Sequence, residues 1–200
     1  MRNSFNAALV FAFLCAVSAA VYFFGPSEIV PRLAVNVPLM LVLPLVVAIH
    51  FRMKKEEFGA SLKEWRKIIL YTCILFLVAI PGMLYAAALP EFQQYYPRFF
   101  AVDPGAFLGF ELMLLPLFLS LEFLYRGFAL FQMKKFVGNY AILLQAIPYA
   151  LIHLGKPLPE LFYSFFAGIV FAYVCIKAKS FLPAFGAHYS TSAIFDLLTW

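Results

Sequence analysis

Apolar residues fill seven long runs of this 200-residue chain, and short connectors with proline, glycine or charged residues separate them. The longer runs have about the 20 consecutive apolar residues that a helix needs to cross a bilayer. We therefore predict an all-α, polytopic transmembrane bundle of about seven spans, as one membrane domain over residues 1–200. The spans are expected at residues 6–25, 33–51, 68–89, 106–132, 140–153, 161–176 and 181–200.

One long polar stretch, residues 52–67, interrupts this pattern with six basic and three acidic residues. Within it, Phe58, Leu62 and Trp65 recur at helical spacing, which suggests a surface helix. A tryptophan in such a segment is typical of the headgroup region. We expect an interfacial helix or loop on the cytoplasmic side.

The composition supports a membrane protein and excludes a soluble globular domain. Hydrophobic residues make up 64% of the chain and charged residues 12%, and the 25 phenylalanines provide bulk for contacts with lipid and between helices. The three cysteines lie within apolar runs and lack the spacing of metal ligands. We therefore expect no disulfide framework.

The net charge of +5 arises from basic residues in the short connectors. This distribution indicates membrane topology and no nucleic-acid partner. With a cytoplasmic N-terminus, the inner side holds eleven basic residues and the outer side only Arg32, Arg98 and Lys156. The positive-inside rule thus predicts a cytoplasmic N-terminus and an external C-terminus. We expect a bacterial inner (plasma) membrane protein.

Three predicted spans carry polar residues along one helix face. Glu122 and Arg126 are four residues apart, so they share a face and can pair. Ionisable residues in lipid normally face the bundle interior and serve a site. The stripes contain Glu111, Glu122 and Arg126 in the fourth span, Gln145, Tyr149 and His153 in the fifth, and His188, Ser192 and Asp196 in the seventh.

The depths of Glu122, His153 and His188 along their helices allow the three side chains to meet inside the bilayer. A desolvated carboxylate can activate water, and neutral imidazoles can orient that water, donate to an oxyanion or bind a metal. Hydrolysis is one interpretation of this grouping. Proton or ion transport through a polar relay and a structural polar contact between helices are two others.

In order and spacing, these residues resemble the three motifs of the CPBP family of intramembrane proteases, the CAAX-protease and bacteriocin-processing (Abi) group. The resemblance covers roughly residues 106–200, which it implies to be the catalytic core. It implies peptide-bond hydrolysis at the membrane. The matching residues are Glu122, Arg126 and Gly127 of a Glu-Glu-x-x-x-Arg-Gly motif, Tyr149 and His153 of an aromatic-x-x-x-His motif, and His188 of a third motif, His-x-x-x-Asn/Asp.

Two positions depart from the family pattern. The family uses the first glutamate of its pair as the base, and this position is Leu121 here. The residue four positions after the third-motif histidine is Ser192, although Asp196 lies one turn further on. If Glu122 does not replace the missing base, the chain is an inactive relative.

We interpret the chain as a glutamate-dependent intramembrane endopeptidase that cleaves a membrane-anchored peptide or protein with activated water. Glu122 is the expected base with Arg126 as its partner, and His153 and His188 hold the water or stabilise the oxyanion. The expected supporting residues are Tyr149, Ser192 and Asp196. No metal is required, although Glu122 and the two histidines are suitable zinc ligands. The alternatives are an inactive immunity or scaffold protein with this fold, and a small transporter.

Overall fold

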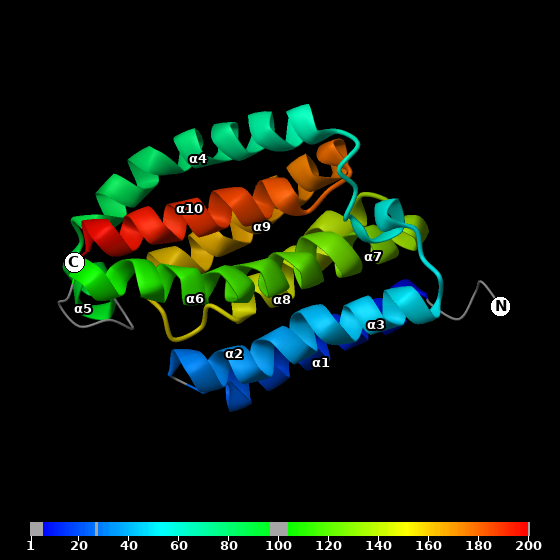
Figure 1. Ribbon diagram of the computed structural model, residues 1–200, viewed down its shortest axis with the longest axis horizontal. Coiled ribbons are helices and arrows are strands. Elements are labelled where there is room, and N and C mark those ends of the chain that lie inside the picture. The colour runs from blue at the N-terminus through cyan, green and yellow to red at the C-terminus, as the bar shows by residue number, and fades with distance from the viewer. Residues whose placement is uncertain (1–5, 27, 97–103, 200) are drawn as a thin grey trace.

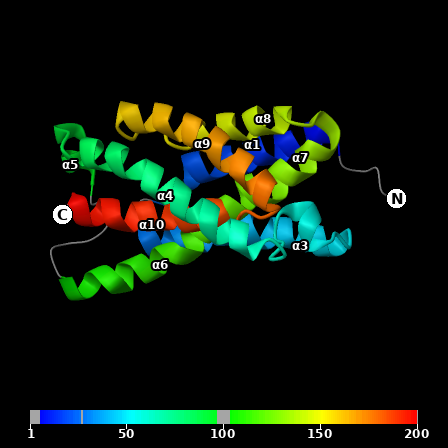
Figure 2. The ribbon, with the colours of Figure 1, turned by 90° about the horizontal axis from the view of Figure 1, so that it is seen from above.

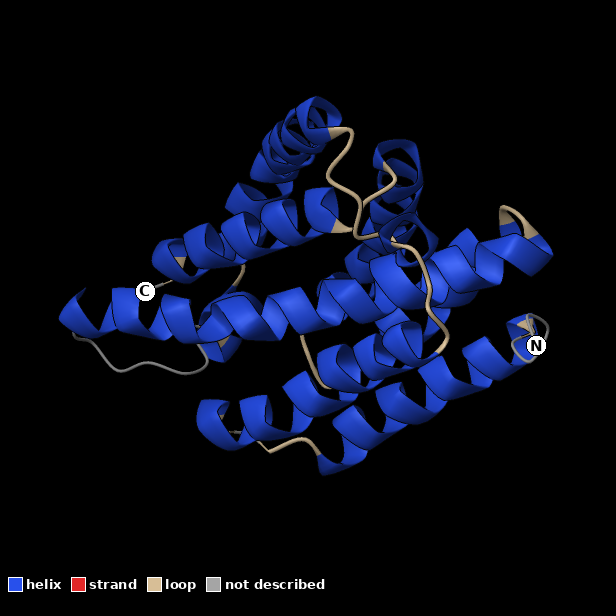
Figure 3. Ribbon diagram, turned by 45° about the vertical axis from the view of Figure 1, so that its right-hand side comes forward, coloured by secondary structure: helices blue, strands red, loops and turns tan. Residues whose placement is uncertain are grey.

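The computed structural model describes residues 6–26, 28–96 and 104–199, and in the last range it describes side chains from Phe107 onward. The described residues form helices joined by loops, and most helices run roughly along one axis (Figure 1, Figure 3). The helices are α1 (Ala7–Phe24), α2 (Ile29–Val37), α3 (Leu43–His50), α4 (Trp65–Ala87), α5 (Pro90–Tyr95), α6 (Pro104–Glu122), α7 (Leu130–Val137), α8 (Tyr140–Leu151), α9 (Leu158–Ala178) and α10 (Leu182–Leu198).

Five helical stretches are long and apolar enough to cross a membrane. The other two predicted spans are shorter helices, α8 with 12 residues and α10 with 17. The all-α bundle confirms the predicted fold class, and its apolar helices mark an integral membrane protein. The five stretches are Ala7–Phe24, Ile29–His50, Trp65–Ala87, Phe107–Val137 and Leu158–Ala178.

Two of these stretches contain a π-helical segment. Pro38–Val42 joins α2 to α3, and Phe123–Ala129 joins α6 to α7. The second π-helix begins directly after Glu122, and all seven of its residues are buried. Segments of this kind are frequent at functional sites, because they change the direction in which side chains leave the helix. The first motif therefore lies at an irregular, fully enclosed part of its helix.

The packed core surrounds this second π-helix. Leu124, Tyr125 and Leu130 belong to one buried cluster with Leu14 of α1 and Met40 of the first π-helix. Lipid is as apolar as these side chains, so close packing, more than removal from water, holds the helices together. Large exposed apolar side chains suited to lipid contact include Phe23, Phe24, Val78, Tyr85, Leu108 and Phe166.

Of the two forms expected for residues 52–67, a helix or a loop, the structure has a loop up to Glu64. Its only helical turn before α4 is the 3-10 turn Lys55–Phe58, which ends at Gly59 with a φ of 69°. The buried ring of Phe58 packs edge-on against Phe123, with 5.9 Å between the ring centres. The 52–64 segment therefore packs against the second π-helix as a loop and does not form a helix at the membrane surface.

Several basic connectors gather at one end of the bundle, which we call the α7 end (Figure 1). The 52–64 loop is tied there by an ion pair between Lys135 and Glu57 and by a bridge between Ala60 and Ser180. The opposite end, which we call the α5 end, contains α5 and the α8–α9 loop (Figure 1). Three residues of the topology argument, Arg2, Arg98 and Trp200, lie outside the described residues. The orientation in the membrane stays a prediction.

Candidate active site

The Glu122 carboxylate is the meeting point of two predicted spans. Its Oε1 accepts hydrogen bonds from Arg126 Nη1 at 3.3 Å and from His188 Nδ1 at 2.7 Å. A carboxylate only accepts hydrogen bonds, so His188 donates through Nδ1 and its Nε2 is left as an acceptor. The side chains of Glu122 and Arg126 are 0% exposed, whereas that of His188 is 18% exposed. Glu122 is therefore enclosed, and His188 is the member of the group that reaches open space.

Arg126 is held by aromatic rings as well as by Glu122. Its guanidinium carbon lies 3.6 Å from the centre of the Tyr149 ring, and 5.6 Å and 5.7 Å from those of Phe171 and Tyr125. Cation–π contacts of this kind are strongest where water is excluded. Nε and Nη2 of Arg126 have no hydrogen-bond partner among the described residues, so these rings supply much of the guanidinium's surroundings.

His153 lies in the turn that follows α8. Its Nδ1 is 2.9 Å from the Tyr149 carbonyl oxygen, which can only accept, so Nδ1 carries the proton and Nε2 is free to accept. The centres of the His153 and His188 rings lie 4.9 Å and 6.3 Å from that of Tyr149. The structure thus brings both histidines and Tyr149 together.

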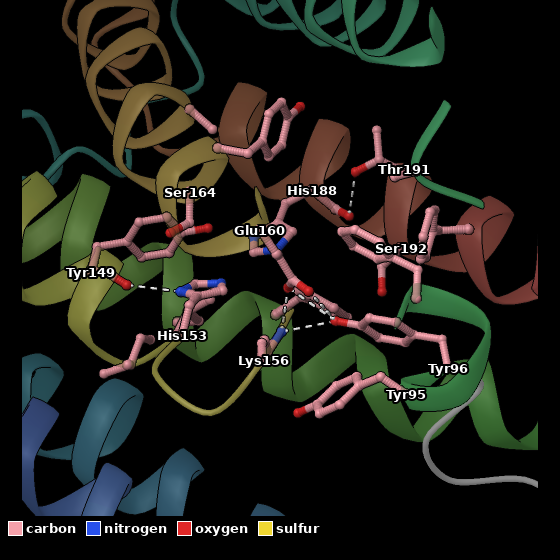
Figure 4. Close-up of a pocket in the computed structure, with 18 of the residues that line it drawn as sticks. Tyr95, Tyr96, Tyr149, His153, Lys156, Glu160, Ser164, His188, Thr191 and Ser192 are labelled. Atoms are coloured by element: carbon pink, nitrogen blue, oxygen red, sulfur yellow. Dashed lines mark hydrogen bonds and ion pairs between the residues drawn. The ribbon is translucent and has the colours of Figure 1, made fainter. Parts of the chain in front are cut away.

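A cavity of about 610 Å³ opens beside these rings and extends toward the α5 end. His153, His188 and Tyr149 line it, and Leu121 lines it where the family motif has its first glutamate. Figure 4 shows the two histidines in this cavity, and Figure 2 shows α10 passing between α6 and α9, which contribute opposite parts of its wall. Most of the wall is apolar and aromatic, which suits a membrane-embedded peptide.

A polar cluster of Tyr96, Lys156 and Glu160 lines the cavity at the α5 end (Figure 4). The Lys156 ammonium donates to Glu160 Oε1 at 2.6 Å and to the Tyr96 hydroxyl at 3.1 Å. Tyr96 in turn donates to the Glu160 carboxylate at 2.9 Å. Burial raises the pKa of Tyr96, so it takes part as a neutral hydroxyl. Sequence analysis missed this cluster, whose one signal was the i, i+4 spacing of Lys156 and Glu160.

The seventh-span stripe divides between two places. Ser192 lines the cavity one turn from His188. Asp196 also lines it, but its carboxyl group interacts with that of Glu111. Eight residues of helix place Asp196 about 12 Å from His188 along the axis. Asp196 is therefore not among the groups around Glu122, and its interaction with Glu111 was not predicted from the sequence.

A zinc site built from Glu122, His153 and His188 does not fit these contacts. Glu122 Oε1 is engaged by Arg126 and His188, so of the three side chains only the histidines keep a free ring nitrogen, Nε2, for a metal ion. Among the described residues, no three histidine, cysteine, aspartate or glutamate side chains are grouped so that they could hold a metal ion.

Two glycines allow the close packing that positions the motif residues. A Cβ on Gly127 would lie 3.1 Å from the Phe58 carbonyl oxygen and 3.3 Å from the Phe123 ring. A Cβ on Gly168 of α9 would lie 3.3 Å from the ring of Tyr149. All three distances are tighter than ordinary van der Waals contact. The glycine that ends the first motif is thus needed where the 52–64 loop meets the π-helix.

Comparison with known proteins gives one match. The model of the family described as Type II CAAX prenyl endopeptidase Rce1-like matches residues 103–194. No curated protein and no solved structure matches the chain. The matched segment contains the residues that match the three motifs, and the match confirms the resemblance indicated by the sequence. Residues 103–194 are thus similar to the Rce1-like endopeptidases, which belong to the CPBP family of intramembrane proteases.

Proposed function

We propose that this protein is an intramembrane endopeptidase that hydrolyses a peptide bond in a membrane-anchored protein or peptide. One observation carries the proposal: the enclosed Glu122 carboxylate binds His188 at 2.7 Å, and His188 lines a 610 Å³ cavity. The Rce1-like match and the apolar helices support a protease acting on a substrate within the bilayer.

The base in this proposal is His188, with Glu122 acting through it. Glu122 is 0% exposed and is not among the residues that line the cavity, so its carboxylate does not meet a water there. Donation from Nδ1 to Glu122 fixes the tautomer that leaves Nε2 of His188 as a proton acceptor. A buried carboxylate also stabilises the imidazolium that forms when Nε2 takes a proton. This arrangement compensates for the leucine at position 121.

The hydrolysis then proceeds in two steps. Nε2 of His188 removes a proton from water as the water oxygen attacks the carbonyl carbon, and His153 Nε2 orients that water by accepting its other hydrogen. The tetrahedral oxyanion accepts a hydrogen bond from the Ser192 hydroxyl. The C–N bond then breaks, and the proton on His188 passes to the leaving amine. The products are a carboxylic acid and an amine, and His188 is neutral again; the acid then loses its proton to the amine or to solvent.

No metal takes part in these steps. Each role falls to a side chain that lines the cavity: His188 as acid and base, His153 as water ligand, and Ser192 as oxyanion donor. Arg126 pairs with Glu122 and stacks on the Tyr149 ring, so it positions side chains of both the first and the second motif.

A comparison of membrane proteomes tests the proposal. Cells with the wild-type protein are compared with cells that carry His188→Ala and with a control, His50→Gln, which changes an exposed histidine outside the cavity. We expect at least one membrane-protein cleavage product in the wild-type and His50→Gln samples that is absent with His188→Ala. Equal product profiles in all three would contradict the proposal.

One observation favours a second candidate, an inactive scaffold: Leu121 lines the cavity where the family has its base. Leu121→Glu separates the two functions, with Leu121→Gln as a control of similar size. An active enzyme yields the cleavage product without either change. A scaffold yields it only with Leu121→Glu.

A further inference from the structure

Asn36 of α2 is a buried polar residue in an apolar stretch that is long enough to cross a membrane. It is 4% exposed and belongs to the stretch Ile29–His50. An asparagine in such a helix normally hydrogen-bonds to a neighbouring helix, because an unpaired polar group is costly in apolar surroundings. The Oδ1 atom of Asn36 is buried and has no hydrogen-bond partner among the described residues. This oxygen therefore needs a donor that these residues do not supply.

Asn36 lines the cavity of the proposed active site. Among the described residues, five side chains have buried atoms without a hydrogen-bond partner, and of these five only Asn36 lines the cavity. Other polar side chains of the wall are already engaged: Lys156 donates to Glu160, and Ser164 donates to the Leu161 carbonyl oxygen. A molecule inside the cavity is thus the best source of a donor for Asn36.

The cavity has Asn36 and His188 on different sides. Both α2 and α10 pack on α6, and Figure 1 shows α6 between them. Phe118 and Leu121 of α6 belong to the same cavity wall, and the Phe118 ring lies 4.6 Å from that of His188. A substrate segment in the cavity therefore has the proposed catalytic histidine on one side and Asn36 on another.

Hydrolysis of a membrane-embedded peptide creates a need for such an acceptor. In an α-helix each main-chain N–H donates to the carbonyl oxygen four residues earlier. A segment that unwinds to present its peptide bond to water loses these hydrogen bonds, and unpaired main-chain groups are costly within a membrane. A cavity that binds an unwound segment must therefore supply hydrogen-bond partners for its main chain.

Resting on the proposed endopeptidase function, we propose that Asn36 binds the main chain of an unwound substrate segment. Its Oδ1 accepts a hydrogen bond from one N–H group of the substrate, a donor that every residue except proline carries. The contact is independent of the substrate's side chains, and it selects a segment that is extended over one that is helical. It holds the segment in the cavity while His188 acts on the scissile bond.

Single ester substitutions in a bound peptide test this contact without requiring catalysis. Purified His188→Ala protein in detergent is titrated with a short fluorescent apolar peptide of non-repeating sequence, and with versions in which an ester oxygen replaces one N–H at a time. We expect one position at which the ester weakens binding about tenfold, because the buried Oδ1 then loses its donor. Adding Asn36→Leu should abolish this loss. An equal effect at all positions, or persistence of every position-specific loss with Asn36→Leu, would overturn the proposal.

Ser164→Ala is the matched control, because Ser164 lines the same cavity but its hydroxyl is already engaged. This variant should keep the position-specific loss. Thermal unfolding in detergent separates substrate binding from a structural role. Leucine is similar in size to asparagine and removes an unpaired oxygen, so Asn36→Leu should not lower the melting temperature. A clear fall, or failure to fold, would indicate a structural role and contradict the proposal.

Failure of this inference differs from failure of the proposed function. Cleavage by Asn36→Leu with the wild-type kcat/KM would refute the contact and leave the endopeptidase proposal intact. Position-specific binding that depends on Asn36, without any cleavage by the wild-type protein, would do the reverse.

Discussion

The carboxylate of Glu122 and the imidazole of His188 lie 2.7 Å apart, although 66 residues separate them in the chain. This contact joins α6 to α10 at the point where the π-helix begins. The enclosed Glu122 carboxylate does not line the cavity, but through this contact it orients His188, which does. The consequences for stability, topology and catalysis can each be measured.

Arg126 is expected to be essential for accumulation of the folded protein as well as for activity. Arg126→Met removes the positive charge beside Glu122 and leaves the buried carboxylate with the His188 hydrogen bond alone, which costs up to about 3–5 kcal/mol. Arg126→Lys keeps the charge but loses the planar stacking on Tyr149, so it should be intermediate. Thermal unfolding in detergent checks this order. Equal stability of Arg126→Met and the wild type would show that the pair does not hold the bundle together.

Gly127→Ala should displace the 52–64 loop, because the new Cβ would lie 3.1 Å from the Phe58 carbonyl oxygen. The expected loss is about 1–3 kcal/mol, with faster proteolytic nicking of the loop. Gly82→Ala is the matched control, since a Cβ there meets no described atom within 4 Å. Equal nicking rates for the two variants would remove the packing role assigned to the motif glycine.

The gathering of basic connectors at the α7 end leads to a topology experiment. The 52–64 loop, the 134–139 turn and the 177–181 turn lie together there, so one side of the membrane should hold them all. An alkaline phosphatase fused after residue 200 should be active, and one inserted near Lys63 should be inactive, as the positive-inside rule predicts. The reverse pattern would invert the orientation.

Much of the architecture was predictable because lipid imposes a simple pattern of long apolar runs. The i, i+4 spacing of Glu122 and Arg126 also indicated their pairing correctly. For the 52–67 segment the sequence left a helix or a loop open, because its apolar spacing reflects the burial of Phe58 against Phe123 and not a helical face. Local spacing does not carry such long-range contacts.

The different surroundings of Ser192 and Asp196, which share one face of α10, could not be predicted for a related reason. Ser192 and Asp196 share a face with His188, but which neighbour each one meets depends on how far α6 runs alongside α10. Glu111 meets Asp196, and Glu122 meets His188. The π-helix after Glu122 could not be predicted either, since its sequence has the pattern of an ordinary apolar α-helix.

Chemical rescue of His188→Ala tests the central claim most directly. Cleavage of the peptide identified by the proteome comparison is measured with and without added imidazole, for His188→Ala alone and combined with Glu122→Gln. If Glu122 acts through His188, imidazole in the vacated space should restore part of the rate to His188→Ala and at least about a hundredfold less to the double variant. Equal rescue of both variants, or none in His188→Ala, would contradict the account.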